Sequence, residues 1–461
     1  MFSKLIGSEK MIFANDKREK MLNDPVQLLV CKMAVPTIIT MLISAFYNMA
    51  DTYFVGQLDT VSTAAVGLAM PLMNVIQAIG FFFGHGSGNY ISKKLGEGDK
   101  KSADTMADTA SVMSVVFGGL MTAAGLLFLA PLVKLLGATP LLMESSMSYI
   151  SIILIGVPFI MTSFTINNQL RFQGNAFYGM IGMASGSVLN VILDPLFIYV
   201  FDMKIKGAAY ATIVSQIVSF VVLMIMSGRI PFRKPEFSLN GELVSAIFKF
   251  GTPSLFRQGI IGIAAICMNN AAGIYGEAVI AAVSVVTKIT MTGASVVIGL
   301  GQGFQPVCGF NSGAGRYDRV YKTFIFCIKA ATAFVLIFGI AVFIFAGELV
   351  AFFRDDPEVI SAGIPILRWQ CFTIMFQGVV IMTNMLLQNM GKTIESSLLA
   401  VARQGLFFIP LIYILPYFLG LTGLQITQAA ADMLTFVVTL PFTFRMIKWL
   451  KEKMNSAEKS A

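Results

Sequence analysis

Residues 41–56, MLISAFYNMADTYFVG, place one carboxylate, Asp51, inside a long apolar run that begins near Cys31. A second apolar stretch, residues 188–201 with the sequence VLNVILDPLFIYVF, carries Asp194. An ionisable side chain inside a membrane span is costly and marks a functional site by default. The two stretches therefore predict a membrane-embedded fold and, within it, the place to look for function.

The composition of the whole chain also indicates a membrane fold. Of its 461 residues, 56% are hydrophobic and 13% are charged, and the mean hydropathy is +0.76. Soluble domains carry roughly 25% charged residues, so this chain has more apolar surface than a soluble core could bury. We therefore expect an all-α polytopic membrane protein in a lipid bilayer.

Twelve apolar runs are long enough to be spans, because about 20 apolar residues cross a bilayer. A polar break near the middle, residues 229–242, predicts a cytoplasmic linker between two six-helix bundles, residues 1–228 and 243–461. The predicted spans are 31–57, 62–90, 105–130, 145–168, 177–201, 206–228, 246–274, 279–309, 319–347, 361–388, 395–418 and 422–447.

The positions of Lys and Arg predict the orientation. Loops after odd-numbered spans hold only Lys134, Lys204, Lys206 and Arg354, whereas loops after even-numbered spans are richer in these residues. Positive residues stay on the cytoplasmic side, so we expect both termini in the cytoplasm and the chain in a bacterial cytoplasmic membrane. This topology accounts for the net charge of +8, and no nucleic-acid partner is expected. The basic residues of the even-numbered loops are Lys93, Lys94, Lys100, Lys101, Arg171, Arg229, Arg233, Lys234, Arg316, Arg319, Lys322 and Lys392.

An internal repeat links the two halves. Pro36 in AVPTII matches Pro253 in GTPSLF, at an offset of 217 (253 − 36). Six spans separate each matched pair, so the halves share one orientation and are predicted to be related by a pseudo-two-fold axis along the membrane normal. The same offset relates further glycines, namely Gly84, Gly86, Gly96, Gly98 and Gly174 to Gly301, Gly303, Gly313, Gly315 and Gly391.

The repeat does not duplicate the carboxylates, because Asp51 falls on Met268 and Asp194 falls on Leu411. Asp51 lies about 20 residues into its span and Asp194 about 17, so at ~1.5 Å per residue both are expected in the outer half. Each acid has a simpler explanation as well: Asp51 could end a helix at the outer water, and Asp194 could be a helix-terminal Asp-Pro.

Amides near the two acids extend the predicted site. Asn48 precedes Asp51 by three residues and Asn190 precedes Asp194 by four, so each shares a helix face with its acid, and Asn167 and Asn168 end the fourth span. Such an oxygen-rich cluster could hold a proton, a cationic substrate, or Na⁺ bound by Asp51, Asp194 and Asn190. Two carboxylates in a low-dielectric site resist joint ionisation, which suits a proton.

Three charged residues of the second half are secondary candidates. Lys288, Arg403 and Asp432 lie within predicted spans, and a Lys288–Asp432 or an Arg403–Asp432 pair is plausible. We give such a pair a structural role ahead of a role in substrate binding.

The sequence offers little for catalysis. The five cysteines are odd in number and contain no C-x-x-C pair, so we interpret them as buried thiols, and the single histidine, His85, excludes a His-cluster metal site. Ser87 lies in a Gly-rich segment without a predicted strand-to-helix turn or a base. No G-x-x-x-x-G-K-[ST] loop is present. We therefore expect no enzyme and no cofactor beyond a coupling H⁺ or Na⁺.

Several motifs carry a resemblance to a known family. NMADTYFVGQL in the first span, the loop SKKLGEGD with its counterpart NSGAGRYDR, and LNVILDP in the fifth span resemble the multidrug and toxic compound extrusion (MATE) family, and the likeness runs from about Pro25 to Lys448. Within the family the chain is most similar to the DinF-like and MepA-like branch.

The resemblance implies drug or toxin export driven by inward flow of H⁺ or Na⁺. By motif position it implies cation-binding acids at Asp51 and Asp194 and a supporting amide at Asn190. The NorM branch carries acids in spans 7 and 10, where this chain has Arg257, Gln258, Gln370 and Gln377. This departure favours the N-terminal bundle as the cation site.

We therefore expect a secondary active multidrug efflux transporter that exchanges cationic or amphipathic organic compounds for H⁺ or Na⁺. A flippase for a lipid-linked or other biosynthetic precursor is the alternative within transport. An intramembrane enzyme and a structural scaffold are disfavoured, the first for want of a catalytic constellation and the second because it needs no buried acids. The expected partners are drug-like molecules and the bilayer, and the expected state is a monomer.

Overall fold

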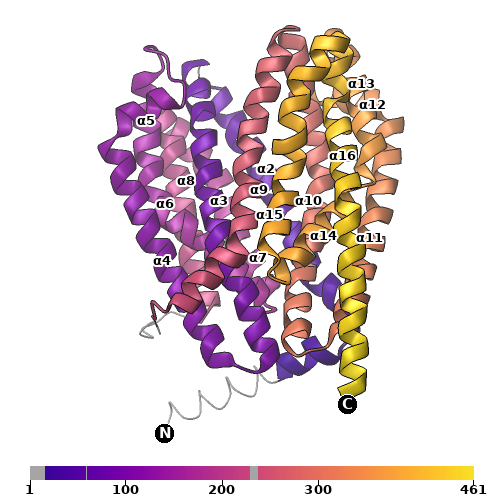
Figure 1. The fold of residues 1–461 in the computed structure, drawn as a ribbon. Coiled ribbons are helices and arrows are strands. Elements are labelled where there is room, and N and C mark those ends of the chain that lie inside the picture. Colours follow the sequence, from indigo (N-terminus) through magenta and orange to yellow (C-terminus); the bar gives the residue numbers. More distant parts are fainter. Residues whose placement is uncertain (1–15, 59, 229–236, 461) are drawn as a thin grey trace. The chain divides into compact units, whose positions relative to one another are not determined.

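The computed structural model describes residues 16–58, 60–228 and 237–460, and these residues are mostly helical and contain no strand (Figure 1). Most of the predicted linker at 229–242 lies outside them, because residues 229–236 are not described. The all-α prediction is confirmed for the described part of the chain.

The chain divides into two compact units. The N-unit is Val35–Gln258, and the C-unit combines Met1–Ala34 with Gly259–Ala461. Their boundaries fall inside two long helices, α2 (Val26–Gly56) and α9 (Gly241–Gly273), rather than at the predicted linker. Each of these helices therefore contributes one end to each unit.

The N-unit is built around α6 (Met143–Phe172), which packs against α3, α4, α7 and α8. Of the most apolar window of α6, 72% is buried, so this helix forms the centre of the unit. The remaining elements of the unit are α3 (Thr60–Glu97), α4 (Lys100–Leu127), α5 (Leu129–Leu135), α7 (Ala176–Pro195), the π-helix η1 (Leu196–Val200) and α8 (Lys204–Met226).

The C-unit repeats this order. Helix α4 runs over Lys100–Leu127 and α11 over Tyr317–Ile344, so both ends differ by 217 (317 − 100 and 344 − 127). The other elements are α10 (Glu277–Gly313), α12 (Ala346–Phe353), α13 (Pro357–Ile374), α14 (Gln377–Asn389), α15 (Thr393–Val401), the π-helix η2 (Ala402–Phe408) and α16 (Ile409–Ser460).

Matched glycines confirm that the repeat is structural. Gly98 and Gly315 have φ values of 87° and 74°, and Gly174 and Gly391 have φ values of 75° and 71°. Glycine has no Cβ and adopts such left-handed conformations readily. The repeat therefore preserves the turns that end its helices as well as their lengths.

The two halves differ at helix breaks. Helix α6 is continuous through Pro158, whereas its counterparts α13 and α14 meet at a bend of 54°. Helix α16 changes direction at Gly420, where φ is 57° and ψ is −138°. The bend between α13 and α14 therefore has no counterpart in the continuous α6, whereas the N-unit has a turn with positive φ values at Asp202 and Lys204 near the position equivalent to Gly420.

The count of spans follows from these breaks. Within the described residues, nine helices are long and apolar enough to cross a membrane, or ten if α13 and α14 form one span. One of the nine, Thr393–Ser456, covers 64 residues and contains the break at Gly420, so it supplies two spans. Counted this way, eleven of the twelve predicted spans meet the test of length and apolarity within the described residues, and the 33-residue α9, which does not meet it, is long enough to be the twelfth.

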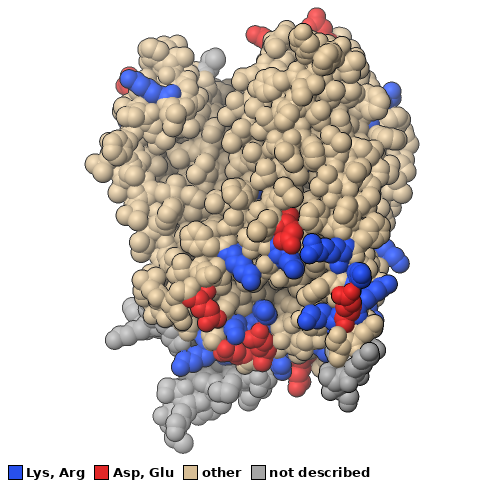
Figure 2. Space-filling view, in the orientation of Figure 1, with Lys and Arg blue, Asp and Glu red and all other residues tan. Residues whose placement is uncertain are grey.

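Surface charge agrees with a bilayer environment. Figure 2 shows Lys, Arg, Asp and Glu side chains gathered toward the lower end of the visible face, with a wide band nearly free of them above. Hydrocarbon disfavours charged side chains, so such a band is expected on lipid-facing helices.

Candidate functional site

The N-unit brings the two predicted carboxylates together. Asp51 lies on α2 and Asp194 on α7, and the charge of Asp51 acts directly on Asp194. Asp51 is 7% exposed and Asp194 is fully buried. The burial of Asp51 argues against the simpler explanation of a helix-end acid in outer water. Asp194 does stand at the end of α7, directly before Pro195, as the Asp-Pro explanation had it, but it is buried and a π-helix follows.

Asn190 supports Asp194 from one turn earlier on α7. In one orientation of the amide, both of its polar atoms form hydrogen bonds. Nδ2 donates to Asp194 Oδ2 at 3.0 Å, and the amide oxygen accepts from the backbone N–H of Thr212 at 3.2 Å. Thr212 belongs to α8, so this contact fixes the carboxylate against a second helix. Asn190 presents a donor to the site, and its oxygen is directed toward the backbone of α8.

Two tyrosines complete the cluster. Tyr47 on α2 and Tyr149 on α6 both lie beside the Thr212 side chain, and each lies within electrostatic range of both carboxylates. Neither tyrosine was predicted to belong to the site. Tyr47 stands four residues before Asp51, so the helix-face argument applied to Asn48 could have found it. No sequence signal points to Tyr149, which only helix packing brings to the site.

One oxygen of each carboxylate forms no hydrogen bond with the described residues. Asp51 Oδ1 and Asp194 Oδ1 are buried and have no hydrogen-bond partner among the described residues. Nor does any Lys, Arg or His of the described segments form an ion pair with either acid. Buried carboxylates without a compensating cation are costly, which favours binding of a proton or another cation.

The backbone near Asp194 is irregular. Helix α7 ends at Pro195, and the π-helix η1 follows directly. Tyr199 of η1 donates its hydroxyl hydrogen to the backbone oxygen of Phe54 at 2.7 Å, and the two rings meet edge to face. Because Phe54 lies three residues after Asp51, η1 ties the two acid-bearing helices together. π-Helical turns recur at functional sites.

The predicted amides Asn167 and Asn168 do not join this cluster. Asn168 donates to the Phe164 backbone oxygen at 2.7 Å and accepts from Arg171 Nη2 at 2.6 Å. It stands 19 residues after Tyr149 on the continuous α6 (168 − 149), a separation of about 28 Å. Including both residues in the site was wrong, because they lie near the opposite end of that helix. Asn48 lies on α2, but its side chain is outside the described structure.

Near that opposite end the N-unit has a basic, buried network. Arg171 Nη2 lies 3.0 Å from His85 Nε2, and the His85 ring stacks on Phe81. Arg257 of α9 is close enough to act electrostatically on both Arg171 and His85. The sequence analysis attached no role to this grouping, because its members come from three helices.

Ser87 belongs to the same region and is fully engaged. Its hydroxyl donates to the Phe83 backbone oxygen at 2.7 Å and accepts from Gln169 Nε2 at 3.1 Å. These contacts give Ser87 a packing role and agree with the prediction that it is not a nucleophile.

The carboxylate of the C-unit is compensated. Asp432 is 3% exposed, and Arg403 contacts both of its oxygens, with Nε–Oδ1 at 2.7 Å and Nη2–Oδ2 at 3.4 Å. Gln377 and Gln428 donate to the same carboxylate at 3.2 and 2.9 Å. Lys288 is exposed on α10 and has no ion pair within the described segments, so the structure selects Arg403 as the partner. A cavity of about 20 Å³ beside this pair has room for about one water molecule.

The donor set bears on which cation would fit. No group of three His, Cys, Asp or Glu side chains within the described residues is arranged to hold a metal ion. The predicted Na⁺ ligands were Asp51, Asp194 and Asn190, but the Asn190 oxygen faces the Thr212 N–H. Asn190 as a Na⁺ ligand does not fit this arrangement, which leaves the two carboxylates.

Comparison with known families places both halves in one group. The MatE family model matches residues 36–196 and again residues 253–414. The two matched segments start 217 residues apart (253 − 36), the offset of the internal repeat. The family model thus matches the chain as a duplication.

Individual relatives agree with this match. The chain is 27% identical over 421 residues to the multidrug export protein MepA of Staphylococcus aureus (strain MRSA252), covering 89% of this chain and 92% of that protein. A structure described as the outward-facing conformation of a multidrug resistance MATE family transporter of the MOP superfamily superposes with a TM-score of 0.86 at 28% identity, over 94% and 99% of the two chains.

A further solved structure is similar in fold. It comes from Pyrococcus furiosus and is described as a MOP superfamily transporter whose reverse polarity of the binding pocket suggests a different function. The TM-score is 0.87 at 26% identity, with coverage of 94% of this chain and 98% of that one.

Proposed function

We propose, from the premise that this chain belongs to the MatE family of membrane transporters, that it is a secondary active multidrug efflux transporter. Its MepA relative is named a multidrug export protein. In this proposal the chain exports cationic or amphipathic organic compounds, and inward flow of a cation drives the export. It works as a monomer in a bacterial cytoplasmic membrane, with both termini on the cytoplasmic side.

The observation that carries this proposal is the pair of uncompensated carboxylates in the N-unit. Asp51 and Asp194 are buried, the charge of Asp51 acts on Asp194, and each has an Oδ1 without a hydrogen-bond partner in the described structure. A site of this kind is stabilised when it gains one positive charge. Binding a coupling cation or a cationic substrate achieves that, and the two compete for the same carboxylates.

H⁺ is the coupling ion that the geometry favours. Asn190 offers an N–H to Asp194 and directs its oxygen to the Thr212 backbone. A proton needs one carboxylate oxygen, whereas Na⁺ needs several oxygen ligands at once. The two free Oδ1 atoms therefore suit a proton that neutralises one acid and relieves the repulsion between them.

Proton binding is coupled to the conformation of the protein through α2 and α7. The Tyr199–Phe54 hydrogen bond ties η1 to α2 close to both acids, so a change in repulsion between the carboxylates acts directly on this irregular segment. A ligand shifts a conformational equilibrium only by its differential affinity for the two states. Protonation supplies that difference here and biases inward against outward access.

The test is ethidium efflux from liposomes that contain the purified full chain, with a pH gradient or a Na⁺ gradient imposed separately. Wild type is compared with Asp194→Asn. Asp202→Asn is the matched control: it makes the same chemical change eight residues further on, at an exposed position whose φ of 48° asparagine also tolerates.

We expect efflux that follows the pH gradient, disappears in Asp194→Asn and persists in Asp202→Asn. Efflux that follows only the Na⁺ gradient would overturn the choice of ion and leave the site standing. Full activity of a folded Asp194→Asn variant would overturn the site itself.

A second function rests on a different observation. The buried Arg171 and the half-buried Arg257 lie near each other and near His85 in the N-unit, which gives this region the positive charge that a lipid-linked or other anionic precursor requires. If neither gradient drives ethidium efflux, the flippase becomes the preferred function. Translocation of a fluorescent lipid-linked diphosphate in the same liposomes, lost in Arg171→Gln and kept in Asp194→Asn, would support it.

A further inference from the structure

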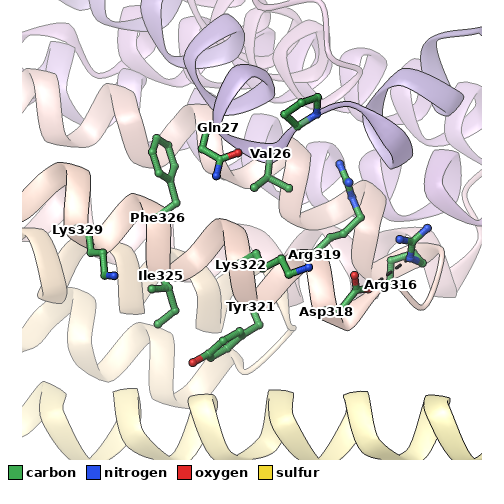
Figure 3. Close-up of a pocket in the computed structure, with 11 residues that line it drawn as sticks. Val26, Gln27, Arg316, Asp318, Arg319, Tyr321, Lys322, Ile325, Phe326 and Lys329 are labelled. Atoms are coloured by element: carbon green, nitrogen blue, oxygen red, sulfur yellow. Dashed lines mark hydrogen bonds and ion pairs between the residues drawn. The ribbon is translucent and has the colours of Figure 1, made fainter.

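A basic groove opens at the start of α11 in the C-unit. Its volume is about 530 Å³, and four basic residues and one acid line it together with Val26 and Gln27 from the start of α2. Figure 3 shows the basic side chains spread along α11, from Arg316 at one end to Lys329 at the other, with Val26 and Gln27 across from them. The groove therefore combines an elongated shape with a formal charge of +3 (four positive, one negative).

The two lysines of the groove are not neutralised by the protein. Arg316 pairs with Asp318 at 3.3 Å, and Arg319 donates to Asn311 Oδ1 and to the Asp24 backbone oxygen. Lys322 and Lys329 are exposed and have no ion-pair partner within the described residues. They are seven residues apart, two helical turns, and so lie on one face of α11.

Among the residues of the groove, Lys329 gives the strongest indication that an anion binds there. It stands twelve residues after Tyr317, the first residue of α11 (329 − 317), which is about 18 Å along the helix. At that depth a helix of 28 residues is inside the bilayer, where an unpaired ammonium is costly. A lysine side chain there extends toward the interface, and an anion at headgroup depth would satisfy it.

Aromatic residues mark the headgroup level at the same end. Tyr317 and Trp449 pack edge to face with ring centroids 5.7 Å apart, and Tyr and Trp concentrate at membrane interfaces. Lys451 adds a further cation on α16, with its Nζ 5.8 Å from the Tyr321 ring. Beyond the charged part, Val26, Ile325 and Phe326 give the groove an apolar wall.

We propose that this groove binds an anionic glycerophospholipid of the cytoplasmic leaflet. Its phosphate lies between Lys322 and Lys329, and an acyl chain runs along Val26, Ile325 and Phe326. Basic pockets beside membrane helices on the cytoplasmic side are suited to such headgroups. The proposal uses the cytoplasmic orientation of this end but does not depend on which compound the protein transports.

The repeat provides an internal comparison. At the offset of 217, Arg316, Lys322 and Lys329 correspond to Asp99, Thr105 and Val112, and Ile325 corresponds to Asp108. The equivalent face of α4 in the N-unit thus has no basic row and carries acids instead. The lipid site belongs to the C-unit alone.

The experiment titrates the detergent-purified full chain with phosphatidylglycerol and, separately, phosphatidylcholine, and counts bound lipid by native mass spectrometry. The test variant is Lys322→Gln with Lys329→Gln. Lys322→Arg with Lys329→Arg keeps the charges, and Lys93→Gln with Lys101→Gln removes the same charge from two exposed lysines at the facing ends of α3 and α4 in the N-unit.

We expect phosphatidylglycerol to bind in preference to phosphatidylcholine. Its affinity should fall about 25-fold in the Lys322/Lys329 glutamine variant, since each lysine near an anionic lipid contributes roughly fivefold. The arginine variant and the Lys93/Lys101 variant should bind as wild type does. Equal binding of the two lipids, an unchanged glutamine variant, or displacement of phosphatidylglycerol by millimolar inorganic phosphate would overturn the proposal, the last by indicating a small-anion site.

Discussion

The two units bury carboxylates in opposite electrostatic settings. In the N-unit, Asp194 lies within electrostatic range of Asp51, and both acids lack an ion-pair partner among the described residues. In the C-unit, Asp432 receives hydrogen bonds from Arg403, Gln377 and Gln428. The first arrangement is poised to gain a positive charge, and the second already holds one.

This difference shows what a duplicated transporter fold keeps and what it varies. Helix ends and left-handed glycines recur at a fixed offset, because they set how each helix turns into the next. Charge does not recur, because a single substitution adds or removes it without changing the helix. One copy is therefore available for ion coupling while the other is held by its own ion pair.

The largest expected effect is on transport through the N-unit. Asp51→Asn should reduce proton-driven efflux to the rate of empty liposomes, because the neutral amide cannot take up the proton that couples the cycle. The same change should leave thermal stability unchanged or higher, because it removes a buried charge without a partner. Efflux assays and thermal unfolding of the same preparation measure both effects.

A strong loss of stability in Asp51→Asn would contradict this view of the pair, since it would mean that the carboxylate has a stabilising partner. Asp202→Asn again serves as the control for the Asp-to-Asn change.

The second effect concerns stability in the C-unit. Asp432→Asn leaves the Arg403 guanidinium without its anion and weakens the hydrogen bonds from Gln377 and Gln428. Removal of one partner of a buried pair costs 3–5 kcal/mol, and because the Arg403 side chain is 32% exposed we expect about 2 kcal/mol. Denaturant unfolding in detergent provides the measurement.

The double variant Arg403→Gln with Asp432→Asn should recover part of that loss, because no unpaired charge remains. If Asp432→Asn keeps full stability but abolishes transport, the compensated pair has a functional role and the contrast between the units fails.

A third prediction concerns what the two units share. A Cβ on Gly86 would lie 2.5 Å from the Ile247 backbone oxygen, and a Cβ on Gly303 would lie 2.6 Å from the Ala34 backbone nitrogen. Backbone yields little, so Gly86→Ala and Gly303→Ala should each cost about 1–3 kcal/mol. Parallel unfolding measurements on the two variants would show whether the losses match.

Clearly unequal losses would mean that the repeat preserves helix ends but not the close contact made by the first helix of each half. Gly259→Ala, where an added Cβ meets nothing within 4 Å, is the control for introducing alanine in place of a helical glycine.

The smallest expected effect on stability is the difference between the N-cap residues of α4 and α11. Asp99 caps α4 by accepting from the Ser102 backbone N–H at 3.1 Å, whereas Arg316 at the start of α11 makes no side-chain cap. Asp99→Ala should cost about 1 kcal/mol, and Arg316→Ala should cost less. Unfolding midpoints of the two variants distinguish them.

The contribution of Asp99 should also depend on pH. Hydrogen bonds from Ser102 hold the pKa of the Asp99 carboxyl below its usual value. A lowered pKa means that the stabilisation is complete above about pH 4 and is lost as the pH falls through the folded-state value. A difference between wild type and Asp99→Ala that persists at pH 2 would contradict a role for the ionised form.

The predictions of the sequence analysis differed in how much they depended on packing. The predicted starts of the spans lie inside the observed helices, because hydropathy is a property of consecutive residues. The prediction that Asp194 shares a face with Asn190 needed only the helical period. The prediction that Asn167 and Asn168 belong to the site was wrong. Their position at the end of a predicted span does not show which end of the neighbouring helices lies beside them.

By itself, the sequence determined the membrane fold, the duplicated order of the helices and the two acids of the N-unit, because length, hydropathy and spacing act along one chain. The tertiary structure decided which side chains from different helices meet. It brought Tyr149 and Thr212 to the carboxylates, turned the Asn190 oxygen toward α8, and gave Asp432 the partner Arg403 rather than Lys288. These choices depend on the rotation and tilt of whole helices, which packing sets and spacing along one chain does not.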